Sequence, residues 1–254
     1  MLKLINNMII SVIPKFFIKI FANQYVAGIS IKNAIAKTMT INKNGLHVTL
    51  DILGEHTATK NEAINITNQY CRILEEINHN SLNCNISIKP SHIGTDISNN
   101  LFMENLDQIH TTATKTNNFI RIDMENSTLI DITLRAYKER VKINENIGIV
   151  LQAYLHRTEN DLNDLKENSN IRLCKGIYNE NEKISFKKGA DINDNYKKLL
   201  KLAFQKKIYT GIATHDLELI DYSLKLIKSM NIDKSMFEFQ MLYGVPMEKY
   251  IKTI

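Results

Sequence analysis

From Gly45 onward, short apolar runs rich in β-branched residues alternate with longer stretches in which apolar residues recur every three or four positions. This alternation is typical of repeated βα units that form a parallel sheet. The predicted strands cover residues 47–53, 85–90, 119–124, 147–153, 171–176, 210–215 and 237–242. The predicted helices include residues 60–79, 128–141, 193–205 and 217–229, each long enough to connect two parallel strands.

A chain of 254 residues with this pattern fits one large domain, because closed α/β barrels run to about 250 residues. No long linker or low-complexity tract interrupts the predicted strands. An open, doubly wound sheet and a closed eightfold barrel both agree with the pattern. Gly148 and Gly176 stand alone instead of forming a glycine-rich fingerprint, which disfavours a dinucleotide-binding fold and a P-loop.

The composition gives further expectations about location and partners. The formal charge of +5 is spread along the chain, so nucleic-acid binding is not predicted. Three widely spaced cysteines favour reduced thiols and a cytoplasmic location. Polar residues and Pro14 interrupt the apolar, basic N-terminus, so neither a transmembrane span nor an export signal is predicted. We expect residues 1–44 to form a helical segment packed on a barrel of residues 45–254, with peripheral membrane contact as the alternative.

Polar side chains stand at or just beyond the carboxyl ends of five predicted strands. In a parallel barrel these ends open on one face, where active sites are built, so residues far apart in the sequence would converge there. The alternative is that strand ends need polar residues simply to meet water. The residues concerned are Lys89, Asp123, Gln152, Lys175, Thr214 and His215.

Two predicted strands also carry charged residues between apolar neighbours. Strand alternation places Arg121, Asp123 and Glu125 on one face of their strand, and Glu238 with Gln240 on one face of theirs. Charges buried without partners cost several kcal/mol, so these side chains are expected either to serve a site or to form an internal ion-pair network.

A third predicted strand carries Arg172 and Lys175. Alternation sends these two side chains to opposite faces, so both reach one site only if the chain leaves strand geometry near Gly176.

Other chemistries fit the sequence less well. No metal site is predicted, because the seven histidines show no HExxH pattern and no zinc-like spacing with cysteine. Cys174 is expected to line the barrel rather than to act as a nucleophile. Lys89 and Lys175 as Schiff-base lysines of an aldolase-like barrel are the best rival interpretation.

Five ordered strings are more specific. RIDMENS, VLQAYLHRTENDL, RLCKGIYNE, IATHD and FEFQMLYGV resemble, in order and spacing, the motif series of the proline dehydrogenase family. Upstream, YVAGISIKNAIAK, LDILGEHT and SIKPSHIG resemble the leading barrel units of the same family. The resemblance runs from about Gln24 to Pro246, nearly the whole chain.

The resemblance implies a (β/α)8 barrel that binds FAD non-covalently and oxidises L-proline to Δ1-pyrroline-5-carboxylate by hydride transfer to flavin N5. Electrons would leave to a quinone or another acceptor. Lys89 matches a residue that faces the substrate carboxylate, and Asp123 one that orients the amine. Tyr178 and Leu242 match residues that form walls around the proline ring, and Arg172 matches a catalytic arginine beside the isoalloxazine.

The remaining matches concern the flavin. Ile122 matches the residue whose backbone lies under the cofactor. The other flavin-binding positions correspond to Gln152, Lys175, Gly176, Ile177, Thr214 and His215. Ile177 replaces the family's usual alanine, which adds volume beside the expected flavin site.

The resemblance also predicts a departure. The family continues past LYGV through an eighth strand and a helix with a paired-arginine motif that clamps the proline carboxylate, whereas this sequence ends at GVPMEKYIKTI. We therefore expect about seven of the eight strands, with the last βα unit missing. Bidentate arginine contacts are strong, so proline affinity is expected to fall. The alternative hypothesis is a non-catalytic fragment that needs a C-terminal piece or a partner; the sequence predicts no oligomeric state.

Overall fold

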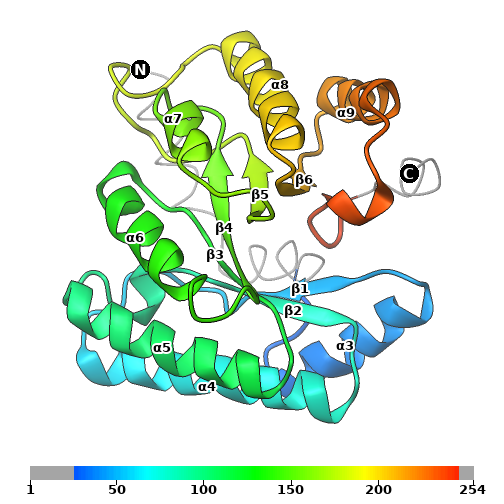
Figure 1. Cartoon of the computed structure of the whole chain (residues 1–254). Coiled ribbons are helices and arrows are strands. Elements are labelled where there is room, and N and C mark those ends of the chain that lie inside the picture. Colours follow the sequence, from blue (N-terminus) through cyan, green and yellow to red (C-terminus); the bar gives the residue numbers. More distant parts are fainter. Residues whose placement is uncertain (1–25, 246–254) are drawn as a thin grey trace, which may run out of the picture.

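The computed structural model describes residues 26–245, and a single parallel sheet organises them (Figure 1). Its seven strands are paired in sequence order, each parallel to the next, and the sheet curls into an incomplete barrel. All seven strands were predicted, and their expected positions are confirmed. They are β1 (Val48–Leu50), β2 (Cys84–Ile88), β3 (Ile120–Ile122), β4 (Ile147–Gln152), β5 (Asn170–Cys174), β6 (Tyr209–Ala213) and β7 (Phe237–Gln240).

Helices alternate with these strands, and they lie on the outside of the curled sheet (Figure 1). The four helices for which the sequence analysis gave residue ranges are confirmed as α4, α6, α8 and α9, whereas α5 and α7 were not among the predicted ranges. The helices are α3 (Ile31–Lys43), α4 (Lys60–His79), α5 (Asn99–Lys115), α6 (Ile130–Arg140), α7 (Thr158–Asn163), α8 (Gly189–Gln205) and α9 (Leu217–Met230). Residues 26–245 also contain three short 3-10 helices: η1 (Ser91–Ile93), η2 (Ser127–Leu129) and η3 (Lys234–Met236).

The helix α4 shows how local sequence sets these elements. Thr59 caps its first turn by accepting a hydrogen bond from the Glu62 N–H, and the Glu62 side chain accepts one from the Thr59 N–H in return. This reciprocal capping satisfies backbone donors that a helix start leaves free. Tyr70, Leu74 and Ile77 then recur at helical spacing and are buried, so one face of α4 covers the sheet.

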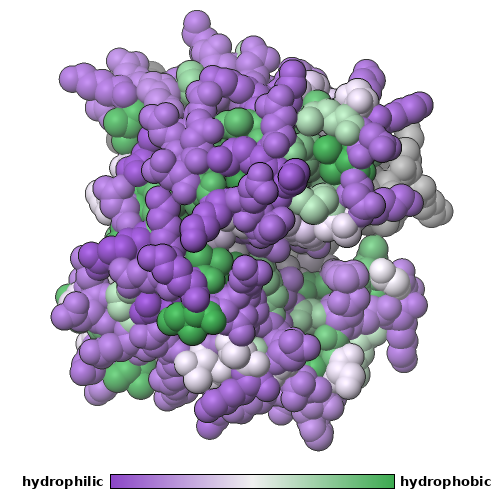
Figure 2. All heavy atoms as spheres, viewed as in Figure 1, coloured by the Kyte–Doolittle hydropathy of each residue, from purple (hydrophilic) through white to green (hydrophobic). Residues whose placement is uncertain are grey.

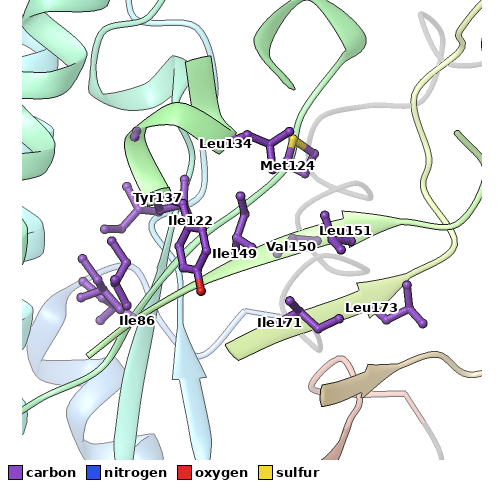
Figure 3. Packing of buried hydrophobic residues seen from close by; sticks show 14 of the residues in the cluster. Ile86, Ile122, Met124, Leu134, Tyr137, Ile149, Val150, Leu151, Ile171 and Leu173 are labelled. Atoms are coloured by element: carbon purple, nitrogen blue, oxygen red, sulfur yellow. The ribbon is translucent and has the colours of Figure 1, made fainter. Parts of the chain in front are cut away.

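The hydrophobic core lies between the sheet and its helices. On the face in Figure 2 the surface is mostly hydrophilic, with hydrophobic side chains in small separate patches. Figure 3 shows the interior, where isoleucines of successive strands stack beside Tyr137 of α6. Strand alternation sends Ile122, Ile149 and Ile171 into this layer and their neighbours in the sequence into the barrel interior.

Two glycines make room for large polar side chains inside the barrel. Gly148 is in register with Arg121, and a Cβ atom on Gly148 would lie 2.9 Å from Arg121 Nη1 and 2.8 Å from the Asn170 carbonyl oxygen. Gly211 is in register with Arg172, and a Cβ atom there would lie 2.8 Å from Gln240 Nε2. The interior is therefore shaped to hold charged and amide groups at this level.

The sheet is open on one side. Within residues 26–245, β1 and β7 each pair with only one strand. The helix α3 packs beside β1, and its Lys37 Nζ lies 5.4 Å from the centre of the Tyr243 ring, which follows β7. Thus α3 contacts the chain at both edges of the opening.

The structure describes only part of the predicted N-terminal helical segment, residues 1–44. The helix α3 falls inside the predicted helical segment 1–44, but residues 1–25 of that segment lie outside the described residues. The domain boundary after residue 44 stays a prediction. None of the helices in the described part of the chain combines the length and apolar character needed to cross a membrane.

The crowding at Gly148 gives a stability prediction. We expect Gly148→Ala to lower the free energy of unfolding by about 1 to 3 kcal/mol, because the new methyl group overpacks the barrel interior. Gly189→Ala is the matched control, since a Cβ at this helical position meets no atom within 4 Å. Urea unfolding of both variants measures the difference. Equal stability of the two variants would contradict the described packing.

Candidate active site at the carboxyl ends of the strands

A cavity of about 1650 Å³ opens at the carboxyl ends of the strands and extends toward α3. A smaller hollow of about 390 Å³ lies at the opposite end of β1 to β3 and contains none of the predicted site residues. Every predicted site residue except Ile122 lines the large cavity. These residues are Lys89, Asp123, Gln152, Arg172, Lys175, Gly176, Ile177, Tyr178, Thr214, His215 and Leu242.

Asp123 and Arg172 form the centre of the cavity wall. Asp123 follows β3 and Arg172 lies in β5, and Arg172 Nη1 donates to Asp123 Oδ1 at 2.9 Å. Arg172 Nε also donates to Gln240 Oε1 of β7 at 2.5 Å. Gln240 in turn donates to Glu238, so the predicted face of β7 joins the same network. Of the two outcomes expected for the charged strand residues, Asp123 therefore shows both, because its ion pair lies within the candidate site, whereas Glu238 is joined to it only by hydrogen bonds through Gln240 and Arg172.

Lys89, just after β2, contacts two carboxylates. Its Nζ forms an ion pair with Asp51 and lies 3.9 Å from Asp123 Oδ2. Burial works to lower the pKa of Lys89, but Asp51 and Asp123 outweigh it, and the net shift is upward. A lysine held in its protonated form is a poor Schiff-base nucleophile, so the geometry disfavours the aldolase-like interpretation at Lys89.

Asp51 was not among the predicted site residues. It follows β1, and Tyr70 OH donates to its Oδ1 at 3.1 Å. Burial raises the pKa of the Asp51 carboxyl, Lys89 opposes this shift, and Asp123 adds to it. The signal that could have identified it is its place, directly after an apolar run like the residues that were selected.

Arg121 and Glu125, which were predicted to share a strand face with Asp123, form hydrogen bonds with other residues. The fully buried Arg121 donates through Nη2 to Asn170 Oδ1 at 2.8 Å, and burial with the nearby Arg172 lowers its pKa to about 9. Glu125 accepts hydrogen bonds from the Ser91 N–H and hydroxyl at 2.7 and 2.5 Å. The predicted shared face is confirmed for Arg121 and Asp123, with Arg121 deeper in the barrel.

Gln152 presents an unsatisfied acceptor. Its Nε2 donates to the Met124 carbonyl oxygen at 2.9 Å, whereas its buried Oε1 has no hydrogen-bond partner within residues 26–245. Buried polar atoms are nearly always paired, so this oxygen marks a place for a ligand N–H or a water molecule.

The chain leaves strand geometry just before Gly176, as needed for Arg172 and Lys175 to reach one site. The strand β5 ends at Cys174, and Gly176 has φ of 99°, while a Cβ on it would lie 2.1 Å from Tyr154 Cδ1. This turn lets Lys175 line the same cavity as Arg172. Lys175 Nζ pairs with Asp216 Oδ2 at 2.5 Å, and this hydrogen bond lowers the pKa of Asp216.

The remaining predicted residues lie around the cavity at different depths. Thr214 is buried and its Oγ1 accepts from the Asp216 N–H at 3.1 Å. His215 Nε2 accepts from the Leu242 N–H at 3.0 Å, which requires that this nitrogen carry no proton. Ile122 is buried in the core, so only its backbone could meet a ligand in the cavity.

The rim is more open than the resemblance suggested. Ile177 is 89% exposed and Leu242 is 70% exposed, so neither forms a closed wall in this structure. The extra volume of Ile177 therefore causes no crowding within the described chain. Tyr178 OH donates to Glu55 Oε1 at 3.2 Å. Glu55 was also missed by sequence reasoning, although it belongs to the quoted string LDILGEHT.

Cys174 behaves as expected for a side chain that lines the barrel. Burial raises the pKa of its thiol to about 11, with Arg172 opposing the shift. Because the thiolate is the reactive form of cysteine, this residue is a poor nucleophile at neutral pH. The three cysteines are all free, as the sequence predicted.

Known structures share this fold. Proline utilization A from Bdellovibrio bacteriovorus, inactivated by N-propargylglycine, superposes with a TM-score of 0.83 at 24% identity over 91% of this chain. Proline utilization A from Corynebacterium freiburgense gives 0.78 at 20% identity over 89%. The chain spans only 30% and 27% of those proteins, and at these identities the likeness concerns the fold alone.

Sequence comparison is more specific. Proline dehydrogenase 2 of Bacillus subtilis strain 168 is 36% identical over 237 residues, covering 93% of this chain and 78% of the relative. Proline dehydrogenase of Deinococcus radiodurans is 33% identical over 232 residues, covering 88% and 74%. The profile of the family described as proline dehydrogenase matches residues 34–252. The chain therefore belongs to the proline dehydrogenase family of oxidoreductases.

Proposed function

We propose that this protein oxidises L-proline to Δ1-pyrroline-5-carboxylate with FAD as its cofactor. The observation that carries the proposal is the convergence of Lys89, Asp123 and Arg172 on one cavity beside the unsatisfied Gln152. The relatives named proline dehydrogenase support the choice of substrate and reaction.

The cavity residues fit a flavin. An isoalloxazine ring offers an imide N–H, which suits the unpaired Gln152 Oε1, and carbonyl oxygens, which suit the Arg172 guanidinium. A pyrophosphate suits Lys175 and the backbone around Gly176. FAD, when bound, accepts at N5 the hydride that proline loses. The other residues proposed to hold it are Ile122, Ile177, Thr214 and His215.

The chain's own groups would position the substrate. Proline carries a carboxylate, for which the protonated Lys89 is the matching cation, and an amine, for which Asp123 is an acceptor. Arg172 keeps the Asp123 carboxylate in place. Tyr178 and Leu242 are proposed to cover the ring. The reaction needs the reacting carbon held close to its acceptor, so fixed charges matter more here than a strong general base.

The same fixed charges have an electrostatic role. A flavin that gains a hydride also gains negative charge, and donors fixed in advance stabilise it without reorganisation. Arg172 is held by Asp123 and Gln240 before any ligand binds, which satisfies that requirement. A quinone or another acceptor would then remove the electrons, and we place the reaction in the cytoplasm, with peripheral membrane contact as the alternative.

One observation favours a second candidate function. The unpaired edges of β1 and β7 in the described part of the chain expose backbone donors and acceptors beside the cavity. On this alternative, the chain is a non-catalytic member of the family, or one that requires a further element or partner at this opening. Flavin retention without proline oxidation would support it.

The first test is spectroscopic. We expect the purified chain to retain FAD, to show the visible absorbance of oxidised flavin, and to lose this absorbance when L-proline is added without oxygen, with Δ1-pyrroline-5-carboxylate as product. D-proline is the control, because one fixed pair of charges cannot hold both enantiomers in the same orientation. A yellow protein that L-proline leaves unchanged would overturn the proposed reaction.

The second test concerns the unsatisfied acceptor. Gln152→Leu removes the amide and should weaken FAD binding about tenfold or more, as expected for loss of about 1.4 kcal/mol. Gln108→Leu on α5 is the matched control, because Gln108 bonds to Asn68 outside the cavity. Fluorescence titration of both apoproteins with FAD measures the dissociation constants. Equal affinities in the two variants would contradict the role of Gln152.

A further inference from the structure

The partner of Lys89 raises a question about charge. Lys89 is the cation proposed to bind a substrate carboxylate, but its Nζ already forms an ion pair with the Asp51 carboxylate. The other nearby carboxylate, Asp123, is shared between Lys89 and Arg172. Two cations and two carboxylates therefore form a balanced cluster before any ligand enters.

A carboxylate ligand would upset this balance. It would place a third negative charge beside Lys89, next to Asp51 and Asp123, inside a cavity that screens charges less than bulk water. Glu55, which contacts Tyr178 on the same cavity, adds a further carboxylate. Neutralising or displacing one carboxylate would relieve this repulsion, and Asp51 is closer to Lys89 Nζ than Asp123 is.

We propose that Asp51 holds the place on Lys89 that a substrate carboxylate takes, and that such a ligand binds together with one proton, which Asp51 accepts. The inference rests on the proposed function, because it concerns the same carboxylate site. The proton comes from solvent and bonds to Asp51 Oδ2, which Lys89 releases. The resulting carboxyl O–H can donate to the ligand carboxylate, while Oδ1 keeps its hydrogen bond from Tyr70.

The surroundings of Asp51 support this assignment. The groups that face it are Lys89 after β2, Tyr70 of α4 and Asp123 after β3. Burial already raises the pKa of the Asp51 carboxyl while Lys89 is still its partner. When Lys89 contacts a ligand carboxylate instead, its lowering effect on the pKa of Asp51 weakens and the ligand adds a negative charge, so we expect this pKa to rise further in the complex.

The sign of the pH dependence follows from this shift. Asp51 binds its proton more tightly in the complex than in the free protein, so ligand affinity is highest at low pH and falls as the pH rises. Between the two pKa values of Asp51, the dissociation constant should increase about tenfold per pH unit. An uncharged residue at position 51 should abolish this dependence of the dissociation constant on pH.

The test uses the FAD-bound full chain and cyclopentanecarboxylate, a ring carboxylate that has no amine to titrate or oxidise. Calorimetric titration in buffers of different ionisation enthalpy counts the protons taken up on binding. In the pH range where the wild-type dissociation constant changes with pH, we expect the wild type to take up about one proton per bound ligand and Asp51→Asn about none. About one pH unit above the range in which the wild-type affinity levels off at low pH, Asp51→Asn should bind the ligand about tenfold more tightly than the wild type.

Asp131→Asn is the matched control, because the Asp131 side chain is 83% exposed and lies outside the cavity lining. It should take up protons as the wild type does. No proton uptake by the wild type, equal uptake by Asp51→Asn, or no binding of the ring carboxylate would each overturn the inference. Bleaching of the flavin by L-proline is measured separately, so these results are distinct from a failure of the proposed function.

Discussion

The ion pair between Asp123 and Arg172 is the interaction on which the site depends. It joins the end of β3 to β5 across β4, with Arg172 Nη1 at 2.9 Å from Asp123 Oδ1. Both side chains are largely withdrawn from water, so each would be costly to bury without the other. Gln240 and Lys89 then attach to this pair from β7 and β2. Four strands are thereby tied together by polar contacts at one end of the sheet.

The rest of the fold makes this arrangement possible. The isoleucines of β3, β4 and β5 bury one face of the sheet against the helices, which fixes the opposite face toward the barrel interior. Gly148 and Gly211 leave space there for Arg121 and Gln240. Gly176 then turns the chain so that Lys175 faces the same cavity. Packing on one side of the sheet therefore positions the charges on the other side.

The sequence predicted the elements well because their signals are local. The alternation of apolar runs and helical stretches located all seven strands of the described residues, and the predicted helix at residues 60–79 matches α4. Arg121 and Asp123 shared a face as expected, since a strand has a fixed period of two. The site residues that the resemblance implied, apart from Ile122, line one cavity, and their roles in catalysis stay predictions.

Contacts between distant segments could not be predicted in the same way. Asp51 and Lys89 are 38 positions apart, and Tyr178 and Glu55 are 123 positions apart, so no periodicity connects them. The exposure of Ile177 depends on how the rim of the cavity is covered, which single strands do not determine. The unsatisfied oxygen of Gln152 became visible only once the neighbours of its side chain were known.

The most direct test of a single coupled site is a double-mutant cycle on flavin reduction. Stopped-flow absorbance would follow anaerobic reduction of the bound FAD by L-proline in the wild type, Asp123→Asn, Arg172→Gln and the double variant. If the pair acts as one unit, each single change should slow reduction nearly as much as both together. Independent effects that multiply in the double variant, or single variants that reduce FAD at the wild-type rate, would contradict the account.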